Sequence, residues 1–400
     1  MADTAAAPRG QLSVIPIVPD ITGARIEVAD PVERARRLAP VIGAAADECE
    51  RNGTLPEPLV ELLKDAGMFW LLVPEEVGGG GEDIVTAIRV VEELSAADGS
   101  VGWTLMANMS VTGYCGGHCT DVAIDTLYLG QEKAIVAGMF APMGRLRRVD
   151  GGVIAQGNYS FGSGTGHATW IGGGARGADG DAEMIFLVPR ENVVFKGGWD
   201  VLGLIGTGSY DYQIPEQFVG DDFVVNRVGG VARRGQPTQR LGLQIIGSAG
   251  HAGVALGLAR HAFEELNAIL SSGKRRAGAE PVIEQQLFRH EFALMEGKLA
   301  AARCYVLDAF GAALETVTRG DAYTELQYQR IRQATTLVTR VAYDAVEFAY
   351  QWSGSKGLRE PGALGRIMRD MHAATQHVYV DSTTLVNAAP PILAAYAPRA

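Results

Sequence analysis

The sequence of 400 residues predicts an α+β protein whose three parts follow one another as helical, β and helical. Three observations indicate this order. Apolar residues recur at helical spacing up to about residue 133, short glycine-punctuated runs of Val, Ile and Phe fill 134–235, and long alanine-rich helical stretches occupy 236–400. Residues 1–25 are rich in Ala, Pro and Gly, so we expect a mobile arm ahead of an N-terminal helical domain at 26–133.

Apolar spacing and end signals justify each helix of the first domain. Pro56 stands where a second helix would begin, and Gly67 follows its end, which is the usual placement of these residues. Four consecutive glycines at 78–81 then interrupt the helical pattern. We therefore expect helices over 31–50, 56–66, 83–97 and 99–114.

The middle part changes to strand patterns. Glycine pairs and triplets punctuate it, and the runs between them are short and rich in apolar or aromatic residues. The clearest strands are expected over 153–161, 184–188 and 210–214. Short strands at this spacing are typical of a small antiparallel barrel or sandwich.

The last part returns to helices, which we expect to form a C-terminal four-helix bundle. The first of them is apolar on most sides and rich in Ala and Gly, so it should be buried between neighbouring helices or between subunits. Such helices bury too little against their own chain, which predicts a homotetramer built as a dimer of dimers. The expected helices cover 241–270, 282–318, 323–353 and 365–388.

Composition excludes several classes of function. The net charge is −11 and no basic run stands out, so nucleic acid is not an expected partner. The four cysteines are too scattered for a disulfide framework, which fits a reducing cytoplasm. We expect no membrane-spanning stretch, no signal peptide and no metal site, because Cys115 and Cys119 lack a second pair at zinc spacing.

Three segments carry a resemblance to a known family. Phe69–Gly79 contains Val-Pro-Glu-Glu-Val-Gly-Gly, Glu92–Ser100 follows it as a helix, and Trp199–Asp211 closes the β-part. In this order and spacing they resemble the acyl-CoA dehydrogenase superfamily over nearly the whole chain. Within it the chain is similar to the oxygenase components of two-component flavin-dependent monooxygenases. That resemblance implies reduced flavin, FMN or FAD, supplied by a separate reductase.

Phe161–Trp170 supports the monooxygenase resemblance. It reads Phe-Gly-Ser-Gly-Thr-Gly-His-Ala-Thr-Trp and is similar to the Ser-Gly-x-x-His-Ala-x-Trp segment of those enzymes. The resemblance implies that Ser163 places a hydroxyl near the flavin N5, that Gly164 lets the backbone approach the ring, and that Trp170 forms an apolar wall. The alternative is a glycine-rich turn with a core tryptophan.

His377 is the expected catalytic partner of Ser163. It ends a helical run near the C-terminus, at the place of the monooxygenases' active-site histidine. A histidine there can hold the distal oxygen of a flavin C4a-hydroperoxide or help to form a phenolate. His372 falls on another helix face and is expected to be a structural histidine, hydrogen-bonded at a helix interface.

The absence of a glutamate argues against dehydrogenase chemistry. Residues 244–250 and 378–385 hold no Glu at the two family positions for the base that removes a proton from carbon. Asp381 is the single acid available there. Phe140–Arg145 also replaces the dehydrogenases' Glu-Pro-x-x-Gly-Ser-Asp segment.

Other flavin contacts follow from the resemblance. Arg275, or the adjacent Arg276, stands where the family places an arginine for the flavin phosphate. Gln351, Ser353 and Gly354 stand near a family motif that reaches a flavin across a subunit interface. Trp103 is a candidate for flanking the ring or the substrate, although a core role is the more common one for tryptophan.

These observations predict an oxygenase that transfers one oxygen atom from O₂ to a small aromatic molecule through a C4a-hydroperoxide. Two alternatives remain open. One is an acyl-CoA dehydrogenase with a displaced base, and the other is a non-catalytic flavin-fold binding protein.

Overall fold

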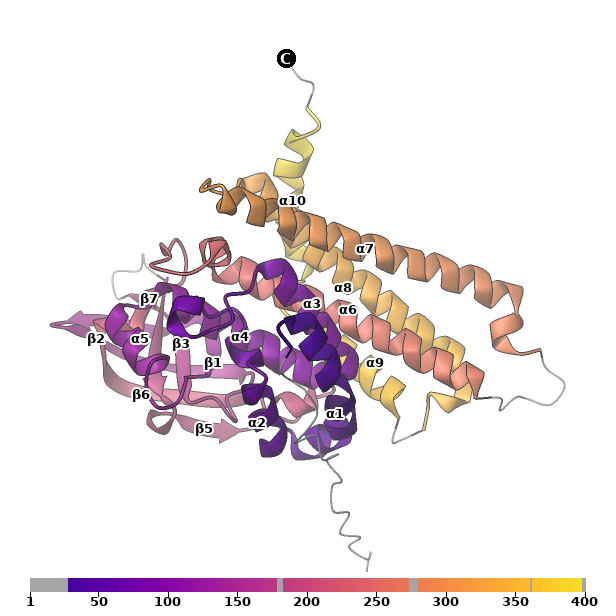
Figure 1. The fold of residues 1–400 in the computed structure, drawn as a ribbon, viewed down its shortest axis with the longest axis horizontal. Helices are drawn as coiled ribbons and strands as arrows, with labels where there is room; N and C mark the ends of the chain where they lie inside the picture. Colours follow the sequence, from indigo (N-terminus) through magenta and orange to yellow (C-terminus); the bar gives the residue numbers. More distant parts are fainter. Residues whose placement is uncertain (1–27, 178–182, 273–279, 360–361, 398–400) are drawn as a thin grey trace, which may run out of the picture.

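The computed structural model describes residues 28–177, 183–272, 280–359 and 362–397, so the arm expected over residues 1–25 lies outside the described residues. Figure 1 shows a sheet on one side of the N-terminal helices and long C-terminal helices on the other. The N-terminal helices are α1 (Pro31–Asn52), α2 (Glu57–Asp65), α3 (Ile84–Ala97), α4 (Gly99–His118) and α5 (Asp121–Leu127).

Aspartate caps explain where these helices begin. The carboxylate of Asp30 accepts from the Val32 N–H, that of Asp83 from Val85 and Thr86, and that of Asp98 from Val101. Each bond satisfies backbone donors that a first helical turn leaves free. The expected helices of the first domain are therefore confirmed.

One seven-stranded sheet forms the central part, in the order β5-β6-β2-β1-β3-β4-β7. Five of its six strand pairs are antiparallel, and β1 with β3 is parallel. The reason is that β2 returns along one edge of β1, after which residues 163–169 cross to its other edge. The strands are β1 (Val136–Val149), β2 (Gly152–Gly162), β3 (Trp170–Gly177), β4 (Glu183–Pro189), β5 (Val194–Gly197), β6 (Tyr210–Gly220) and β7 (Val224–Asn226).

The C-terminal part is helical, as expected. Its first helix is the core of the molecule, because it packs against α3, α4, α8 and α9. Glycines allow this close approach: a Cβ on Gly257 would lie 2.5 Å from the Glu92 carbonyl oxygen. The helices are α6 (Gly242–Ser271), α7 (Gln286–Thr318), α8 (Glu325–Ser353), α9 (Ala363–Ala374) and α10 (Ser382–Ala394).

We expected no apolar stretch that could span a membrane. Judged by length and composition alone, this expectation is wrong. Residues Pro237–Ser271 are long and apolar enough. Most of this stretch is buried inside the fold, where other helices replace lipid as its apolar surroundings. Its hydrophobicity is that of a core helix.

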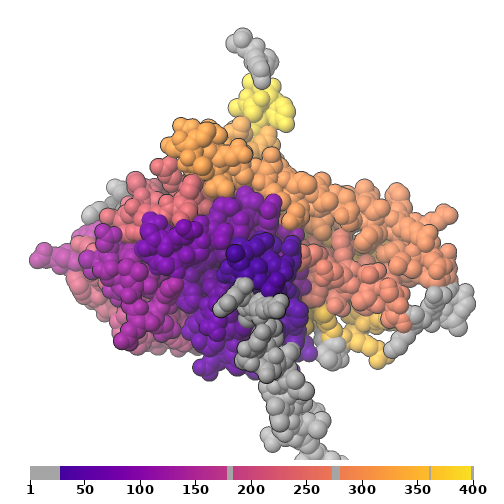
Figure 2. All heavy atoms as spheres, in the orientation of Figure 1, coloured from indigo at the N-terminus to yellow at the C-terminus, as the bar shows by residue number. Residues whose placement is uncertain are grey.

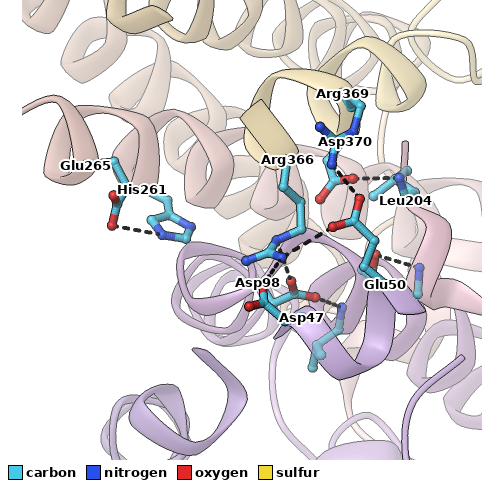
Figure 3. A network of polar contacts seen from close by, with 12 residues as sticks. Asp47, Glu50, Asp98, Leu204, His261, Glu265, Arg366, Arg369 and Asp370 are labelled. Atoms are coloured by element: carbon cyan, nitrogen blue, oxygen red, sulfur yellow. Dashed lines mark hydrogen bonds and ion pairs between the residues drawn. The ribbon is translucent and has the colours of Figure 1, made fainter. Parts of the chain in front are cut away.

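A buried ionic network joins three parts of the chain (Figure 3). Arg366 on α9 lies 2.6 Å from the Asp47 carboxylate on α1 and 3.8 Å from that of Asp98, which caps α4. Asp370, also on α9, accepts from the Leu204 N–H at 2.6 Å. Leu204 has a φ of 55°, a left-handed conformation that a non-glycine residue adopts at some cost. The network therefore fixes a strained loop and α9 against α1 and α4.

Asp370 should make the protein less stable as the pH rises. Burial, and then the nearby Asp98, raise the pKa of Asp370 from 3.8 to about 8. Between these two values the folded protein holds a proton that the unfolded chain has released, so stability is full below about pH 4 and is lost as the pH rises toward 8. Asp370→Asn keeps an oxygen for the Leu204 N–H but cannot ionise. We expect it to flatten the decline in the free energy of unfolding between pH 5 and pH 8.

Urea unfolding at several pH values measures this slope. Asp47→Asn is the matched control, because Asp47 contacts the same arginine but is half exposed. An Asp370→Asn protein with the wild-type slope would show that this carboxyl is already ionised in the fold.

Candidate active site

A chain of hydroxyl groups lies where the β-part meets α4. The Trp103 Nε1–H donates to Ser163 Oγ at 3.0 Å, and Ser163 Oγ lies 2.7 Å from Ser209 Oγ. Ser209 Oγ is also 2.7 Å from Thr207 Oγ1, which donates to the Leu204 carbonyl at 2.8 Å. Trp103 and Ser163, which were both predicted as site residues, are thus in direct contact.

The end of this chain sets the direction of every bond in it. A hydroxyl has one proton to donate, and Thr207 uses its proton on the Leu204 carbonyl. Ser209 must therefore donate to Thr207, and Ser163 must donate to Ser209. Ser163 Oγ already accepts from Trp103, so one acceptor position remains. Ser163 is thus prepared to receive one further hydrogen bond.

The turn that holds Ser163 is attached to α4. Asn108 Nδ2 donates to the Ser163 carbonyl at 3.3 Å, and Asn108 Oδ1 lies 2.9 Å from His167 Nε2. Gly164 has a φ of 71°, and a Cβ there would lie 2.2 Å from Asn108 Oδ1. Only glycine fits this position. The requirement for Gly164 comes from packing against Asn108.

His377 lies in the turn after α9, within a cluster of rings. Its ring centroid is 4.0 Å from that of His251 on α6, 4.9 Å from Tyr379 and 5.9 Å from Trp103. Burial, and then the charge of Arg332, lower the pKa of His377 from 6.5 to about 4. The imidazole is therefore neutral at neutral pH.

A backbone hydrogen bond determines which nitrogen of His377 carries the proton. The Tyr379 N–H donates to His377 Nδ1 at 3.2 Å, so Nδ1 is an acceptor. A neutral imidazole with an acceptor at Nδ1 carries its hydrogen on Nε2. His377 therefore offers an N–H donor in its resting state and is a weak base.

His251 was missed by the sequence interpretation. It is 5% exposed, lies edge-on to Trp103 at 5.0 Å, and its pKa is lowered by burial and by its neighbours His377 and Arg332. The available signal was a histidine between glycines and alanines in the first half of α6. Such a residue is usually a satisfied core histidine, and sequence alone does not bring it to His377.

Other predicted residues lie elsewhere. Trp170, at the start of β3, stacks on Phe223 with centroids 5.0 Å apart. Ser163 and Trp170 have no hydrogen bond or ring contact with one another in the described part of the chain. Gln351, Ser353 and Gly354 form the end of α8, where Ser353 Oγ donates to the Tyr350 carbonyl at 2.7 Å. Arg275 lies outside the described residues.

The remaining candidate residues have structural contacts. His372 Nε2 lies 2.9 Å from the Glu347 carboxylate, in keeping with the structural role expected for it. Asp381 is partly exposed and caps α10, where its carboxylate accepts from Thr383 and Thr384. Its pKa is lowered, chiefly by the Thr383 hydroxyl, so it is a poor base.

A hollow of about 610 Å³ lies on the sheet, away from this cluster. Arginines and a few apolar groups line it, and none of the predicted site residues does. Its principal lining residues are Met143, Arg145, Arg147, Ile154, Gln156 and Arg176.

Comparisons with known proteins agree with the fold. Residues 32–120 match the family described as acyl-CoA dehydrogenase, N-terminal domain, and residues 249–382 match acyl-CoA dehydrogenase, C-terminal domain. Indole-3-acetate monooxygenase of Pseudomonas putida is 27% identical over 86% of this chain and 89% of its own length.

Two further comparisons extend this agreement. The flavin-dependent monooxygenase, oxygenase subunit HsaA, of Rhodococcus jostii is 25% identical over 88% of this chain and 94% of its own. The structure of XiaF from Streptomyces sp. in complex with FADH2 and glycerol has a TM-score of 0.83, with 21% identity over 92% of this chain and 95% of that one. At that identity, the likeness to XiaF bears on the fold.

The tautomer of His377 can be tested directly. We expect its imidazole to stay neutral from pH 8 down to about pH 5, because burial and Arg332 disfavour the cation. NMR of protein with isotope-labelled histidine should show an Nε2–H tautomer that titrates near pH 4, with His377→Gln assigning the signal. A midpoint near 6.5 would contradict the buried position of this ring.

Proposed function

Because the chain belongs to the acyl-CoA dehydrogenase superfamily, we propose that it is the oxygenase component of a two-component flavin-dependent monooxygenase. A separate reductase supplies its reduced flavin, FMN or FAD, and one oxygen atom of O₂ passes to a small aromatic substrate. The names of two relatives support this proposal, since they are monooxygenases and one is called an oxygenase subunit. We further propose a cytoplasmic enzyme.

The single observation that carries the proposal is the composition of the ring and hydroxyl cluster. Trp103, Ser163, His251 and His377 supply donors and aromatic surfaces. No carboxylate hydrogen-bonds or ion-pairs with any of these four within the described ranges. Removal of a proton from carbon needs such a base, whereas oxygen transfer needs donors and exclusion of water.

Ser163 suits a reduced flavin. Reduced flavin supplies the electrons that activate O₂. Its N5–H is a donor, and Ser163 Oγ has one acceptor position left after its bond to Trp103. Gly164 does not contribute to this fit, because the space beside it is filled by Asn108. Trp103, which orients Ser163, also meets the histidines, so it lies between the proposed flavin and oxygen-binding groups.

His377 is proposed to act as a hydrogen-bond donor. Its Nε2–H can hold an oxygen atom beside the rings of His251, Tyr379 and Trp103. Its pKa of about 4 makes proton abstraction from a phenol unfavourable. Of the two roles considered for this histidine, the donor role is therefore the better supported.

The rival functions have less support. For a dehydrogenase, the one acid near the family position is Asp381, which is engaged as a helix cap. A trans-2-enoyl product from a saturated acyl-CoA would nevertheless favour that alternative. Bound flavin without any oxygenated product would favour a binding protein.

The proposed homotetramer has one supporting feature. Helix α10 stands clear of the body in Figures 1 and 2. Its side chains include apolar groups that are well exposed in one chain, namely Val386 at 69%, Leu393 at 70% and Tyr396 just beyond its end at 76%. Exposed apolar groups on a projecting helix favour burial against another copy.

His377→Ala should separate catalysis from folding. Loss of the donor is expected to lower product formation by about 10²–10⁴-fold, the range for an acid–base or donor group. The thermal midpoint should stay near wild type. Product and H₂O₂ are measured with reductase-supplied flavin and indole-3-acetate or 4-hydroxyphenylacetate. His372→Ala is the control, because its partner is Glu347. Equal losses in both variants would contradict the proposed role.

Ser163→Ala should divert O₂ to H₂O₂ while flavin binding changes little, because only one hydrogen bond to the flavin is lost. Ser209→Ala tests the direction of the hydroxyl chain. It removes the acceptor of the Ser163 proton and should weaken coupling less than Ser163→Ala does. The ratio of H₂O₂ to product measures coupling. If neither variant changes this ratio, Ser163 is only part of a turn.

A further inference from the structure

Arg332 on α8 is a partly buried cation with too few partners. Its Nη2 donates to Thr384 Oγ1 at 3.1 Å. Its Nη1 is buried and has no hydrogen-bond partner. Within the described ranges, no carboxylate lies at ion-pair distance from it, whereas other arginines of this chain, such as Arg366 and Arg260, have such partners. The Arg332 charge is therefore left without a counterion.

Burial of the Arg332 guanidinium without a counterion costs free energy. A guanidinium does not lose its proton in proteins, so burial cannot neutralise it as it neutralises a histidine. A buried donor without a partner costs about 1–3 kcal/mol, and more when it carries a charge. An anion that accepts from Nη1 would remove this cost. Arg332 Nη1 is thus an unpaired donor that a negatively charged group would satisfy.

The position of Arg332 links that anion to the ring cluster. The guanidinium carbon lies 5.7 Å from the Tyr379 ring centroid, and the Tyr379 ring is 4.9 Å from His377 and 5.4 Å from His251. The charge of Arg332 lowers the pKa of both histidines. Arg332 also opposes the rise in the pKa of Tyr328 that burial causes, through its charge and through a side-chain hydrogen bond to this neutral phenol. The electrostatic potential at the cluster is therefore positive.

The nearest acid does not neutralise this potential. The charge of Arg332 acts on Asp381, but the Asp381 carboxylate already accepts hydrogen bonds from Thr383 and Thr384 and is not at ion-pair distance from Arg332 in the described residues. The other groups around Arg332 are the neutral Thr384, Tyr328 and Tyr379. A neutral aromatic substrate would leave the guanidinium without a counterion. An aromatic substrate with a carboxylate would pair with it.

We propose that Arg332 binds the carboxylate of the substrate, so that this enzyme acts on aromatic acids whose ring lies beside the cluster of Trp103, His251, His377 and Tyr379. This inference rests on the proposed function and makes its substrate class narrower. A charge-assisted hydrogen bond from Nη1 would favour the acid over an uncharged molecule of the same shape. Arg332 is then a specificity-determining residue.

The test compares each aromatic acid with its amide, which has nearly the same shape and no charge. Calorimetric titration of the whole oligomer, without flavin, measures binding of indole-3-acetate, 4-hydroxyphenylacetate and benzoate, and of the three corresponding amides. Wild-type protein should bind at least one acid about tenfold or more tightly than its amide, as expected for a hydrogen bond to a charged group. Arg332→Met should abolish this preference and leave amide binding within about twofold.

Arg340→Met is the matched control. Arg340 is also on α8 and donates to a hydroxyl at the start of α10, Ser382 Oγ at 3.1 Å, but it is exposed. It should retain the wild-type preference for the acid. An Arg332→Lys protein, which keeps the charge, should retain part of it.

Three outcomes would overturn the proposal. The first is equal binding of acids and amides by wild-type protein. The second is equal loss of both in Arg332→Met. The third is dissociation of the oligomer by Arg332→Met without any change in acid preference, which would assign the missing anion to another copy of the chain. Product formation with reduced flavin is measured separately. Selective binding of acids without product would reject the proposed function and leave the role of Arg332 intact.

Discussion

The position of the candidate site depends on the ionic network around Arg366. This arginine and Asp370 lie on α9, and they contact α1, the start of α4 and the loop at Leu204. Three of these elements carry a residue of the ring and hydroxyl cluster or are followed closely by one. Helix α4 carries Trp103, the Leu204 loop continues to Thr207 and Ser209, and α9 ends three residues before His377. One set of polar contacts therefore sets the relative positions of segments that are far apart in the sequence.

Hydrogen bonds at the site have directions that follow from this framework. The Leu204 carbonyl takes the Thr207 proton, and this orients every hydroxyl as far as Ser163. In the same way, the Tyr379 N–H leaves the proton of His377 on Nε2. The site thus presents an acceptor at Ser163 and a donor at His377. Neither polarity can be inferred from the type of residue alone, because a hydroxyl and an imidazole can each do both.

The cluster is also shaped by the charge of Arg332. Desolvation and this positive charge act together to keep both histidines neutral. A positive potential without protonated histidines favours anions and leaves imidazole N–H groups available as donors. This combination suits oxygen transfer to an electron-rich ring better than proton abstraction from carbon.

The sequence by itself determined the three-part order of helices, strands and helices. Helical spacing, end signals such as Pro56 and Gly67, and glycine punctuation are local signals, so they can be recognised without the fold. It also indicated Ser163, Trp103 and His377, through a resemblance whose motifs are short and contiguous. The burial of α6 between neighbours followed from its small residues.

Only the tertiary structure decided which other residues these side chains contact. The parallel pairing of β1 with β3 depends on a crossover that no short segment encodes. His251 and Arg332 come from α6 and α8, and their contact with the turn after α9 arises from packing between helices distant in sequence. Trp170 stacks on Phe223, and this contact also depends on packing between segments distant in sequence. Residue type and spacing determine local structure, whereas partners, protonation states and unpaired charges depend on which distant segments the fold brings together.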